Sequence, residues 1–481
     1  MKFTDIPTFK PQMKVLNHEQ ALAIHTTALE ILENIGFKME HPGALELLIR
    51  AGAKVSNGNW VKLPAYIVEE SLKSSPKQII LYDQIGNESM TLANGNCFYG
   101  TGSDANLTLD LKNGRRRRVV LKDVGNFARL VDGLEHIDFV MSMANPGDVP
   151  IKDIYIHTFA EMVKNTNKPI VFIADSGKDI AKIYDIACLK ASGEGKLQLN
   201  PFIINYSEAV SPLRFPLNVM EKLMFCAEKR IPICLPSGSN AGGGAPVTLA
   251  GALALGIAEN LVGLSVHQLV NKGAPFIFGP NVSVLDMQSA VVSYGCPEWS
   301  LTGAALADMR DEIYGLPSWA CAGASDAKIM DAQAGAEAMF SIINTMLSRC
   351  NLIHDMGFLE YGSTSSLEMV TMANELVAMS RFFIEGIPVN KNTLALEAIE
   401  RVVSGGPGAI FLTNGHTYKN FRQAQFIPKL LDRSRHDLWN ESGALDLYQR
   451  CNAEAKRILS EHQMEPIPDE MAQEIDQILQ A

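Results

Sequence analysis

The feature that most constrains the fold is a repeated alternation of short apolar runs with longer helical patterns through the middle of the chain. This alternation is typical of repeated βα units and a parallel sheet. The candidate strands cover residues 97–101, 139–143, 170–174, 202–206, 233–235, 276–279, 319–322 and 352–356. The helical patterns between and after them cover 122–134, 154–165, 178–190, 217–229, 248–272, 299–314, 332–348 and 367–385.

Eight consecutive βα units predict an α/β fold of the (β/α)8 TIM-barrel type, because eight strands can close a sheet without an exposed edge. A doubly wound open sheet is the alternative. It would normally carry a G-x-G-x-x-G dinucleotide fingerprint. The nearest candidate, Gly242-Gly243-Gly244, follows a strand but lacks that spacing, so the sequence favours the barrel.

Three domains are predicted along the chain. Residues 1–95 form an N-terminal helical layer, with helices over 19–35, 42–51 and 64–72 and a short strand at 79–82. The TIM-barrel catalytic domain covers 96–390. Residues 391–481 form a C-terminal helical cap, which begins with a helix over 391–404 and could also make an oligomer contact.

Composition and charge exclude several classes of protein. The chain of 481 residues is 47% hydrophobic and carries a net charge of −11, which indicates a globular enzyme and disfavours nucleic acid as a partner. The basic run from Arg115 to Arg118 is too short to change this. Residues 1–5 do not open a secretory signal, and the apolar stretch 248–272 is predicted as a buried barrel helix. We therefore expect a cytoplasmic protein with no membrane partner.

Cysteine and histidine spacing indicates neither disulfides nor a metal site. The eight cysteines are dispersed without a C-x-x-C pair, and the ten histidines occur singly. The chain also lacks G-x-S-x-G, H-E-x-x-H and P-loop motifs. Buried free thiols and no bound metal are the expectation.

Acidic residues follow several of the predicted strands. In a TIM barrel, catalytic groups come from the C-terminal ends of the strands. The first strand leads into Gly100-Thr101-Gly102-Ser103-Asp104, where the glycines allow close backbone approach and Asp104 either caps a turn or faces the barrel mouth. Asp175 follows the third strand and Glu208 the fourth. Three acids facing one cavity would suit a cationic substrate.

The densest cluster of polar and aromatic residues follows the eighth strand, with His354, Asp355, Phe358 and Tyr361 close together. Aromatic faces and acids suit a quaternary ammonium group, which has no N–H to donate. His354 alone is equally consistent with a hydrogen-bonded core histidine. Arg310, which lies among acids, either forms a surface salt bridge or binds a substrate carboxylate. The loop after the fifth strand, 236–246, is either an anion-binding loop or a flexible connection.

Motifs spread over nearly the whole chain add a family resemblance. They are Tyr99-Gly100-Thr101-Gly102-Ser103-Asp104, Asp110 with Gly114, Gly315-Leu316-Pro317-Ser318, Ser325-Asp326-Ala327-Lys328, Asp331-Ala332-Gln333-Ala334-Gly335, His354-Asp355-Met356-Gly357-Phe358-Leu359-Glu360, His416-Thr417, Pro428, Asp432-Arg433 and Trp439. In these motifs the chain resembles the trimethylamine methyltransferase family. The resemblance implies a TIM barrel that transfers a methyl group from an amine to Co(I) of a cognate corrinoid protein docked over the barrel mouth.

The trimethylamine enzymes of that family carry pyrrolysine, whereas this chain contains only standard residues. It is therefore similar to the non-pyrrolysine branch, whose substrates include glycine betaine, proline betaine and carnitine. The resemblance implies a corrinoid-dependent methyltransferase with no tightly bound cofactor, because cob(I)alamin or a related corrinoid is carried, and becomes methylated, on the partner protein. A homo-oligomer is a further expectation.

The hypothesis for substrate binding involves Asp104, Glu208, Arg310, Trp319, His354, Phe358 and Tyr361. Phe358, with Tyr361 or Trp319, and one of the two acids would contact the trimethylammonium group. Arg310 and His354 would hold the carboxylate. No residue is assigned a catalytic role beyond substrate positioning. Two alternative functions are a betaine- or osmolyte-binding protein without chemistry and a metal-dependent barrel hydrolase, which the scattered histidines disfavour.

Overall fold

The computed structural model describes residues 7–464 and 466–480, so the N-terminal stretch 1–5 lies outside the described residues. Seven of the eight predicted core strands are present as named strands. The other one, predicted at 139–143, is present only as the bridge residues Phe139 and Val140. The named strands are β6 (Phe98–Thr101), β9 (Ile170–Phe172), β10 (Ile203–Tyr206), β12 (Ile233–Cys234), β14 (Phe276–Ile277), β16 (Trp319–Cys321) and β17 (Leu352–Met356).

These eight segments pair in parallel and in a cyclic order. One sheet runs β9–β10–β12–β14, and another runs β16–β17–β6. Three parallel bridges connect the two sheets: Phe278 with Ser318, Gly100 with Phe139, and Val140 with Ile170. Each segment therefore pairs with its neighbours in sequence, and the last returns to the first. This order differs from a doubly wound sheet, in which the strand order reverses at a switch point.

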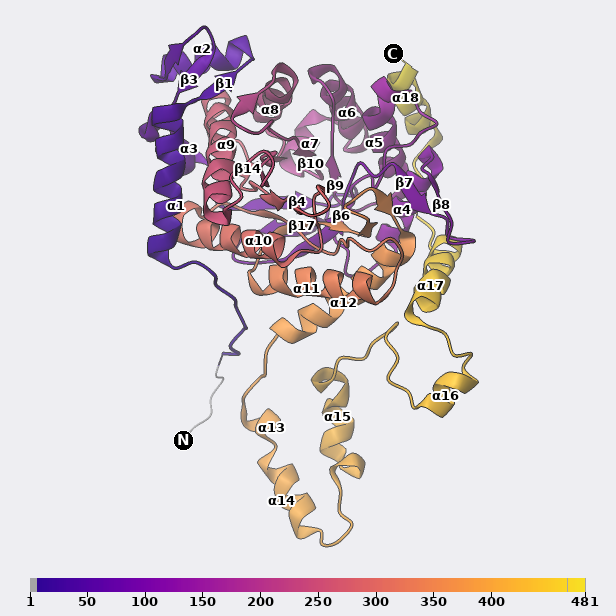
Figure 1. Ribbon diagram of the computed structural model, residues 1–481. Helices are drawn as coiled ribbons and strands as arrows, with labels where there is room; N and C mark the ends of the chain where they lie inside the picture. The colour runs from indigo at the N-terminus through magenta and orange to yellow at the C-terminus, as the bar shows by residue number, and fades with distance from the viewer. Residues whose placement is uncertain (1–6, 465, 481) are drawn as a thin grey trace.

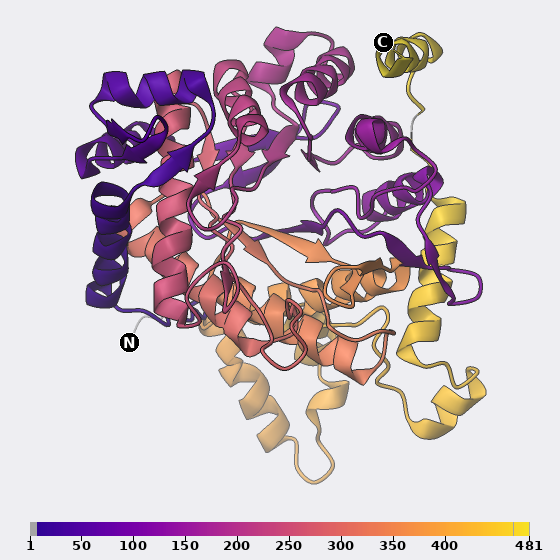
Figure 2. The same ribbon diagram turned by 45° about the horizontal axis from the view of Figure 1, so that its top comes forward.

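Helices connect the strands and pack around them (Figure 1, Figure 2). They are α4 (Leu121–Asp132), α5 (Ile154–Asn165), α6 (Gly177–Lys190), α8 (Leu217–Lys229), α9 (Leu249–Val270), α10 (Pro297–Met309), α11 (Ala332–Leu347) and α12 (Leu367–Ile384). By length and composition α9 could cross a membrane, but 83% of its most apolar window is buried inside the protein. This confirms the prediction of a buried helix over 248–272.

The N-terminal layer packs against α9. Its helices are α1 (His18–Glu30), which continues as a π-helical turn (Ile31–Ile35), α2 (Pro42–Ala51) and α3 (Ala65–Ser74). The sequence did not predict the small sheet that this layer also contains. That sheet consists of β1 (Phe37–Met39), β2 (Lys54–Ser56), β3 (Trp60–Lys62) and β11 (Arg214–Phe215).

A hairpin of β4 (Ile79–Tyr82) and β5 (Glu88–Leu92) covers the N-terminal ends of the core strands. Leu81 and Met90 on this hairpin pack with strand residues such as Phe139, Ile204 and Leu352 in one buried apolar cluster. The backbone N–H of Tyr82 donates to the carbonyl oxygen of Pro201, which precedes β10, at 2.9 Å. The hairpin therefore fills the centre of the strand ring at its N-terminal end.

The C-terminal region contains helices that pack on the body and helices that extend from it. In Figure 1, α13 (Lys391–Leu394), α14 (Leu396–Ser404) and α15 (Gly415–Ala424) hang below the body. After α16 (His436–Glu441), α17 (Leu447–Glu461) packs against α12 and α4, and α18 (Asp469–Gln480) packs against α6 and α5. The remaining short α-helix and strands are α7 (Glu194–Leu199), β7 (Leu107–Leu109), β8 (Arg116–Arg118), β13 (Asn240–Ala241), β15 (Ser283–Val284), β18 (Phe358–Leu359) and β19 (Thr364–Ser365).

Candidate functional site

A cavity of about 710 Å³ lies at the C-terminal ends of the core strands. Its wall carries Asp104, which follows β6, Asp175, which follows β9, Glu208, which follows β10, and His354 and Asp355 of β17. The expectation that the acids after the first, third and fourth strands share one cavity is therefore confirmed. Because parallel strands end at the same side of a sheet, residues far apart in sequence meet here.

The wall of the cavity is strongly acidic. Four carboxyl groups and one lysine, Lys222, line it among the described residues. The ammonium group of Lys222 is turned to the backbone, because it donates to the carbonyl oxygen of Ala174 at 2.7 Å. A cation that enters the cavity would meet a field of uncompensated carboxyl groups.

Asp104 projects into this cavity from a backbone in the left-handed region, with φ +71°. Asn145 Nδ2 donates to its carboxyl group at 3.0 Å, and the Tyr155 hydroxyl donates at 3.3 Å. Desolvation by the surrounding protein raises the pKa of Asp104, while these hydrogen bonds oppose the rise. The positive φ is uncommon for a residue with a side chain, and here it directs the carboxyl group at the cavity.

Glu208 is the second acid that faces the open space. The Tyr206 hydroxyl donates a short hydrogen bond to Glu208 Oε1. Desolvation raises the pKa of Glu208, the hydrogen bond from Tyr206 opposes this, and the nearby Asp104 adds to the rise. A bound cation would favour the ionised forms of Glu208 and Asp104. The two acids therefore make the cavity more favourable for a positively charged ligand.

The glycine at position 102 is required by close packing in this wall. A Cβ atom there would lie 2.2 Å from both Asp355 Oδ1 and Phe358 Cε2. Any side chain would displace one of these two groups. This confirms the prediction that the Gly100–Asp104 segment permits close backbone approach.

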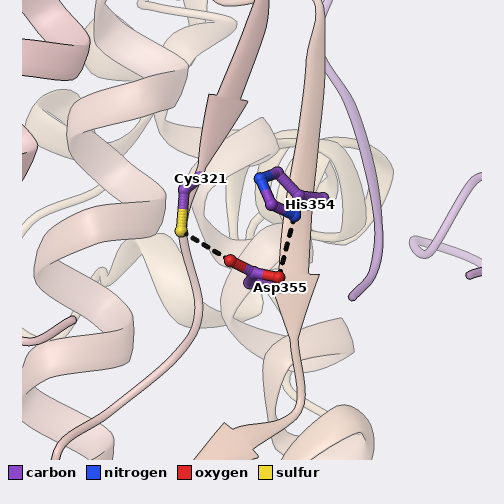
Figure 3. Close-up of side chains that lie close together, drawn as sticks. All are labelled: Cys321, His354 and Asp355. Carbon is purple, nitrogen blue, oxygen red and sulfur yellow. Dashed lines mark hydrogen bonds and ion pairs between the residues drawn. The ribbon is translucent and has the colours of Figure 1, made fainter. Parts of the chain in front are cut away.

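His354 lies at the base of the cavity among aromatic rings, and it is only 5% exposed. The centroid of its ring is 4.5 Å from that of Trp319 and 5.9 Å from that of Tyr206. Its Nδ1 lies 2.8 Å from Asp355 Oδ1, and the thiol of Cys321 donates to Asp355 Oδ2 at 2.9 Å (Figure 3). Asp355 itself has φ +78°, which turns consecutive side chains of the strand toward one another.

Aromatic side chains form part of the wall and the mouth. Phe358 lines the cavity and is buried, whereas Tyr361, at 43% exposure, lies at the mouth. Tyr294 and Trp299 also line the cavity, with ring centroids 4.3 Å apart, and neither was predicted from the sequence. Both belong to the connection between the sixth and seventh core strands. An aromatic residue in a loop after a strand end is a signal that could have identified Tyr294, whereas Trp299 belongs to helix α10 and offered no such signal.

Asp326, part of the Ser325–Lys328 motif, holds the loop that carries Tyr294. Its carboxyl group accepts hydrogen bonds from the Ser293 hydroxyl at 2.5 Å and from the backbone N–H groups of Tyr294 at 2.9 Å and Gly295 at 3.1 Å. This motif residue therefore positions the wall of the cavity and does not line it. The glycines at 242–244 also lie outside the lining residues, although Ser237, Gly238 and Asn240 of the same loop belong to them.

Two of the predicted site residues are not on the cavity wall. Trp319 packs behind His354 and is 2% exposed. Arg310 lies at the opposite end of the strands, where its guanidinium group pairs with Asp311 and donates to Ser318 Oγ at 3.2 Å and to the Arg349 carbonyl oxygen at 2.5 Å. The helical turn Arg310–Tyr314 leads into the start of β16, so its side chains meet the N-terminal ends of the strands. The structure does not bring Arg310 to His354. Of the two alternatives for Arg310, the structure shows the salt bridge, because its buried guanidinium group pairs with Asp311, which is exposed.

Comparisons with known proteins agree with this architecture. The family described as trimethylamine methyltransferase (MTTB) matches residues 2–480. A glycine betaine methyltransferase of Desulfitobacterium hafniense (strain Y51) is 32% identical over 98% of this chain and 96% of its own length. The trimethylamine methyltransferase MttB of D. hafniense (strain DSM 10664 / DCB-2) is 31% identical over 96% of this chain and 92% of its own length.

Among solved structures, the monomethylamine methyltransferase MtmB of Methanosarcina barkeri has a similar fold. It superposes with a TM-score of 0.54 at 10% sequence identity and covers 93% of this chain and 88% of its own. At that identity the likeness concerns the fold alone. The family match extends over nearly the whole sequence, and the resemblance noted in the motifs is thereby confirmed. The chain belongs to the trimethylamine methyltransferase (MTTB) family.

Proposed function

We propose that this protein is a TIM-barrel methyltransferase that demethylates a betaine-type quaternary amine, glycine betaine or proline betaine, and passes the methyl group to Co(I) of a cognate corrinoid protein. The observation that carries the proposal is the cavity with four carboxyl groups and several aromatic rings at the C-terminal ends of the strands. The glycine betaine methyltransferase among the relatives supports the choice of a betaine.

The cyclic strand pairing supports a closed (β/α)8 barrel with its mouth at this cavity. We propose the division into an N-terminal layer (1–95), a catalytic barrel (96–390) and a C-terminal cap (391–481). The proposed location is the cytoplasm. A second copy of the chain is a further proposed partner, through the exposed apolar side chains of the extended C-terminal helices, among them Leu396, Val403 and Tyr418.

The substrate would be held by its charge and by its shape. A trimethylammonium group has no N–H to donate, so it is attracted by carboxylates and by the faces of aromatic rings. Asp104 and Glu208 supply the charge, and Phe358, with Tyr361 at the mouth, supplies the rings. His354 lies near the substrate's carboxylate end. In this assignment Trp319 supports the His354 ring from behind, and Arg310 has no part in binding.

The chemistry demands little of the side chains beyond positioning. The corrinoid, carried by the partner protein, would supply the Co(I) nucleophile that takes the methyl group, and this chain would not itself hold the corrinoid tightly. The substrate nitrogen keeps the electron pair of the broken C–N bond and leaves as a neutral tertiary amine, so no residue has to donate a proton. The cavity walls hold one methyl group toward the mouth and exclude water. Two of the lining residues, Tyr361 and Val291, are 43% and 38% exposed, so the mouth of the cavity is open to solvent.

A methyl-transfer assay tests the proposal. The purified chain is mixed with reduced cob(I)alamin or the cognate corrinoid protein, and the absorbance of methylcobalt is followed with glycine betaine, proline betaine, carnitine and trimethylamine. We expect turnover with one betaine and none with trimethylamine. Tight binding of a betaine without methyl transfer would instead support a binding protein. Silence with every amine, once the corrinoid is shown to be reduced, would refute the proposed reaction.

A further inference from the structure

Cys321, His354 and Asp355 form a cluster of metal-ligating side chains at the base of the cavity (Figure 3). They come from the adjacent parallel strands β16 and β17, in which Cys321 is directly opposite His354. The ligand atoms of the three residues all lie within 4.8 Å of one another. Cys321 and Asp355 are 34 positions apart, so no metal-binding spacing is visible in the sequence. The pairing of two strands creates the cluster.

The imidazole of His354 lacks the hydrogen bonds that its burial requires. Neither ring nitrogen has a hydrogen-bond partner within the described part of the chain, although the residue is only 5% exposed. The 2.8 Å approach of Nδ1 to Asp355 Oδ1 lacks hydrogen-bond geometry. Buried polar groups without partners are rare in proteins, because their desolvation is not repaid. This ring is therefore suited to a ligand that accepts its lone pair.

A thiolate, an imidazole and a carboxylate are a donor set that suits zinc, and three protein ligands with one open position are typical of its reactive sites. Ligands bonded to zinc lie about 3.5 Å from one another, as follows from metal–ligand bonds of roughly 2.0 to 2.3 Å. The present separations of 2.8 and 2.9 Å from Asp355 require only a small outward movement. Cys321 would bind as a thiolate, so one proton leaves its sulfur when the Zn–S bond forms.

Such an ion would also give the cavity a positive group for the carboxylate of the substrate. A betaine carries a carboxylate as well as its ammonium group, and the cavity wall is acidic. Arg310 lies at the other end of the strands, and Lys222 is turned to the carbonyl oxygen of Ala174. An ion bound to Asp355 would neutralise one acid and attract the carboxylate, while Asp104 and Glu208 remain for the ammonium group.

We propose that Cys321, His354 and Asp355 bind one zinc ion, whose open position faces the cavity and takes the carboxylate of the substrate. The zinc site stands on its own geometry, and its role toward the carboxylate rests on the proposed betaine function.

Metal analysis of the full chain tests the site itself. After incubation with Zn²⁺ and dialysis, we expect about one zinc per chain by mass spectrometry. Cys321→Ser and His354→Gln should each lose most of it. Cys350→Ser is the matched control, because that thiol is buried at the other end of β17, and it should retain the zinc. Zinc that stays absent from the wild type, or that is unchanged in both site variants, would overturn the proposal.

Cobalt substitution keeps the test independent of whether the variants fold. Wild-type protein loaded with Co²⁺ should show the charge-transfer absorption of a thiolate bound to cobalt. The Cys350→Ser control should show the same band. Cobalt that binds without this band would contradict Cys321 as a ligand.

Calorimetry then tests the role of the ion. Glycine betaine and choline share a trimethylammonium group, and only glycine betaine has a carboxylate. Removal of zinc by a chelator should weaken the binding of glycine betaine on the order of 30-fold, the effect of losing one partner of a buried charge pair, and leave choline binding unchanged. Equal betaine affinity with and without zinc would overturn the carboxylate role. Failure of the proposed function would look different, because neither compound would then bind while the metal content remained.

Discussion

The two ends of the strand ring differ in whether their charged side chains have partners. At the N-terminal ends, Lys168 donates to the carbonyl oxygens of Val131, Leu134 and Ile137, and Arg381 pairs with Asp138 at 2.6 Å. At the C-terminal ends, Asp104, Asp175 and Glu208 face open space without an ion-pair partner among the described residues, and the only lysine among the described lining residues faces the backbone. Paired charges at one end serve stability, whereas unpaired acids at the other have a use only when a cation arrives.

The largest effect that this contrast predicts is a loss of activity at the acidic end. Glu208→Gln keeps the shape of the side chain but removes the charge that faces the ammonium group. We expect kcat/KM for the betaine substrate to fall about 30-fold or more, the effect of truncating one partner of a desolvated charge pair. Steady-state methyl transfer measures this.

Glu135→Gln is the matched control for that substitution. Glu135 lies at the opposite end, is largely exposed and pairs with Lys429. The methyl-transfer activity of Glu135→Gln should equal that of the wild type. A similar loss in both variants would show that net charge, and not the position of Glu208, governs catalysis.

The second effect is a loss of stability at the filled end. Leu81 on the β4–β5 hairpin is fully buried, so Leu81→Ala leaves a cavity in the apolar cluster. The free energy of unfolding should fall by about 2 to 5 kcal/mol, as measured by urea denaturation. Leu199→Ala, at a position 74% exposed, should change it little. Betaine affinity of the folded Leu81→Ala protein should be unchanged, and weaker binding would show that the two ends are coupled.

Arg310 sharpens the comparison, because the sequence suggested a role at one end and the structure places it at the other. Arg310→Met removes hydrogen bonds to Ser318 and the Arg349 carbonyl oxygen and should lower the free energy of unfolding by about 2 kcal/mol. The exposed pair of Arg50 and Glu46 is the control, because Arg50→Met should cost less than about 1 kcal/mol. The betaine KM should not change. A raised betaine KM with an unaltered free energy of unfolding would contradict this and would support a role of Arg310 in substrate binding.

Much of the fold was predictable from the sequence because it depends on local patterns. The apolar runs at 170–174 and 352–356 and the helix over 154–165 agree closely with β9, β17 and α5. The small sheet of β1 with β11 was not predictable, because it pairs short segments that are far apart in sequence. The helix over 19–35 was predicted as one element, although it ends in a π-helical turn.

The site was predictable where a residue directly follows a strand, as Asp104, Asp175 and Glu208 do. Trp319 and Arg310 show the limits of that rule. Trp319 lies at the start of β16, and Arg310 lies in the turn that leads into that strand, so neither reaches the C-terminal end. Cys321 became part of the cluster only through its register opposite His354, which depends on strand pairing and not on spacing.

The smallest predicted effect concerns the stability of the acidic end without substrate. Desolvation raises the pKa of Glu208 above its ordinary value of 4.5, so the folded state holds this proton more tightly than the unfolded state does. The free energy of unfolding should therefore fall as the pH rises from about 4.5 through the raised pKa. Glu208→Gln removes that dependence and should be more stable than the wild type at pH 7, by less than about 1 kcal/mol because cavity water screens the charge.

Thermal melting at several pH values measures this difference, which should vanish in acid, where Glu208 is protonated in both states. Saturating betaine should reverse the order at pH 7, since ligand that binds only the folded wild type stabilises it by mass action. Equal melting temperatures for the two proteins at every pH would mean that the Glu208 carboxyl group is fully solvated in the empty cavity. The contrast with the paired N-terminal end would then rest on geometry and not on an electrostatic cost in the empty cavity.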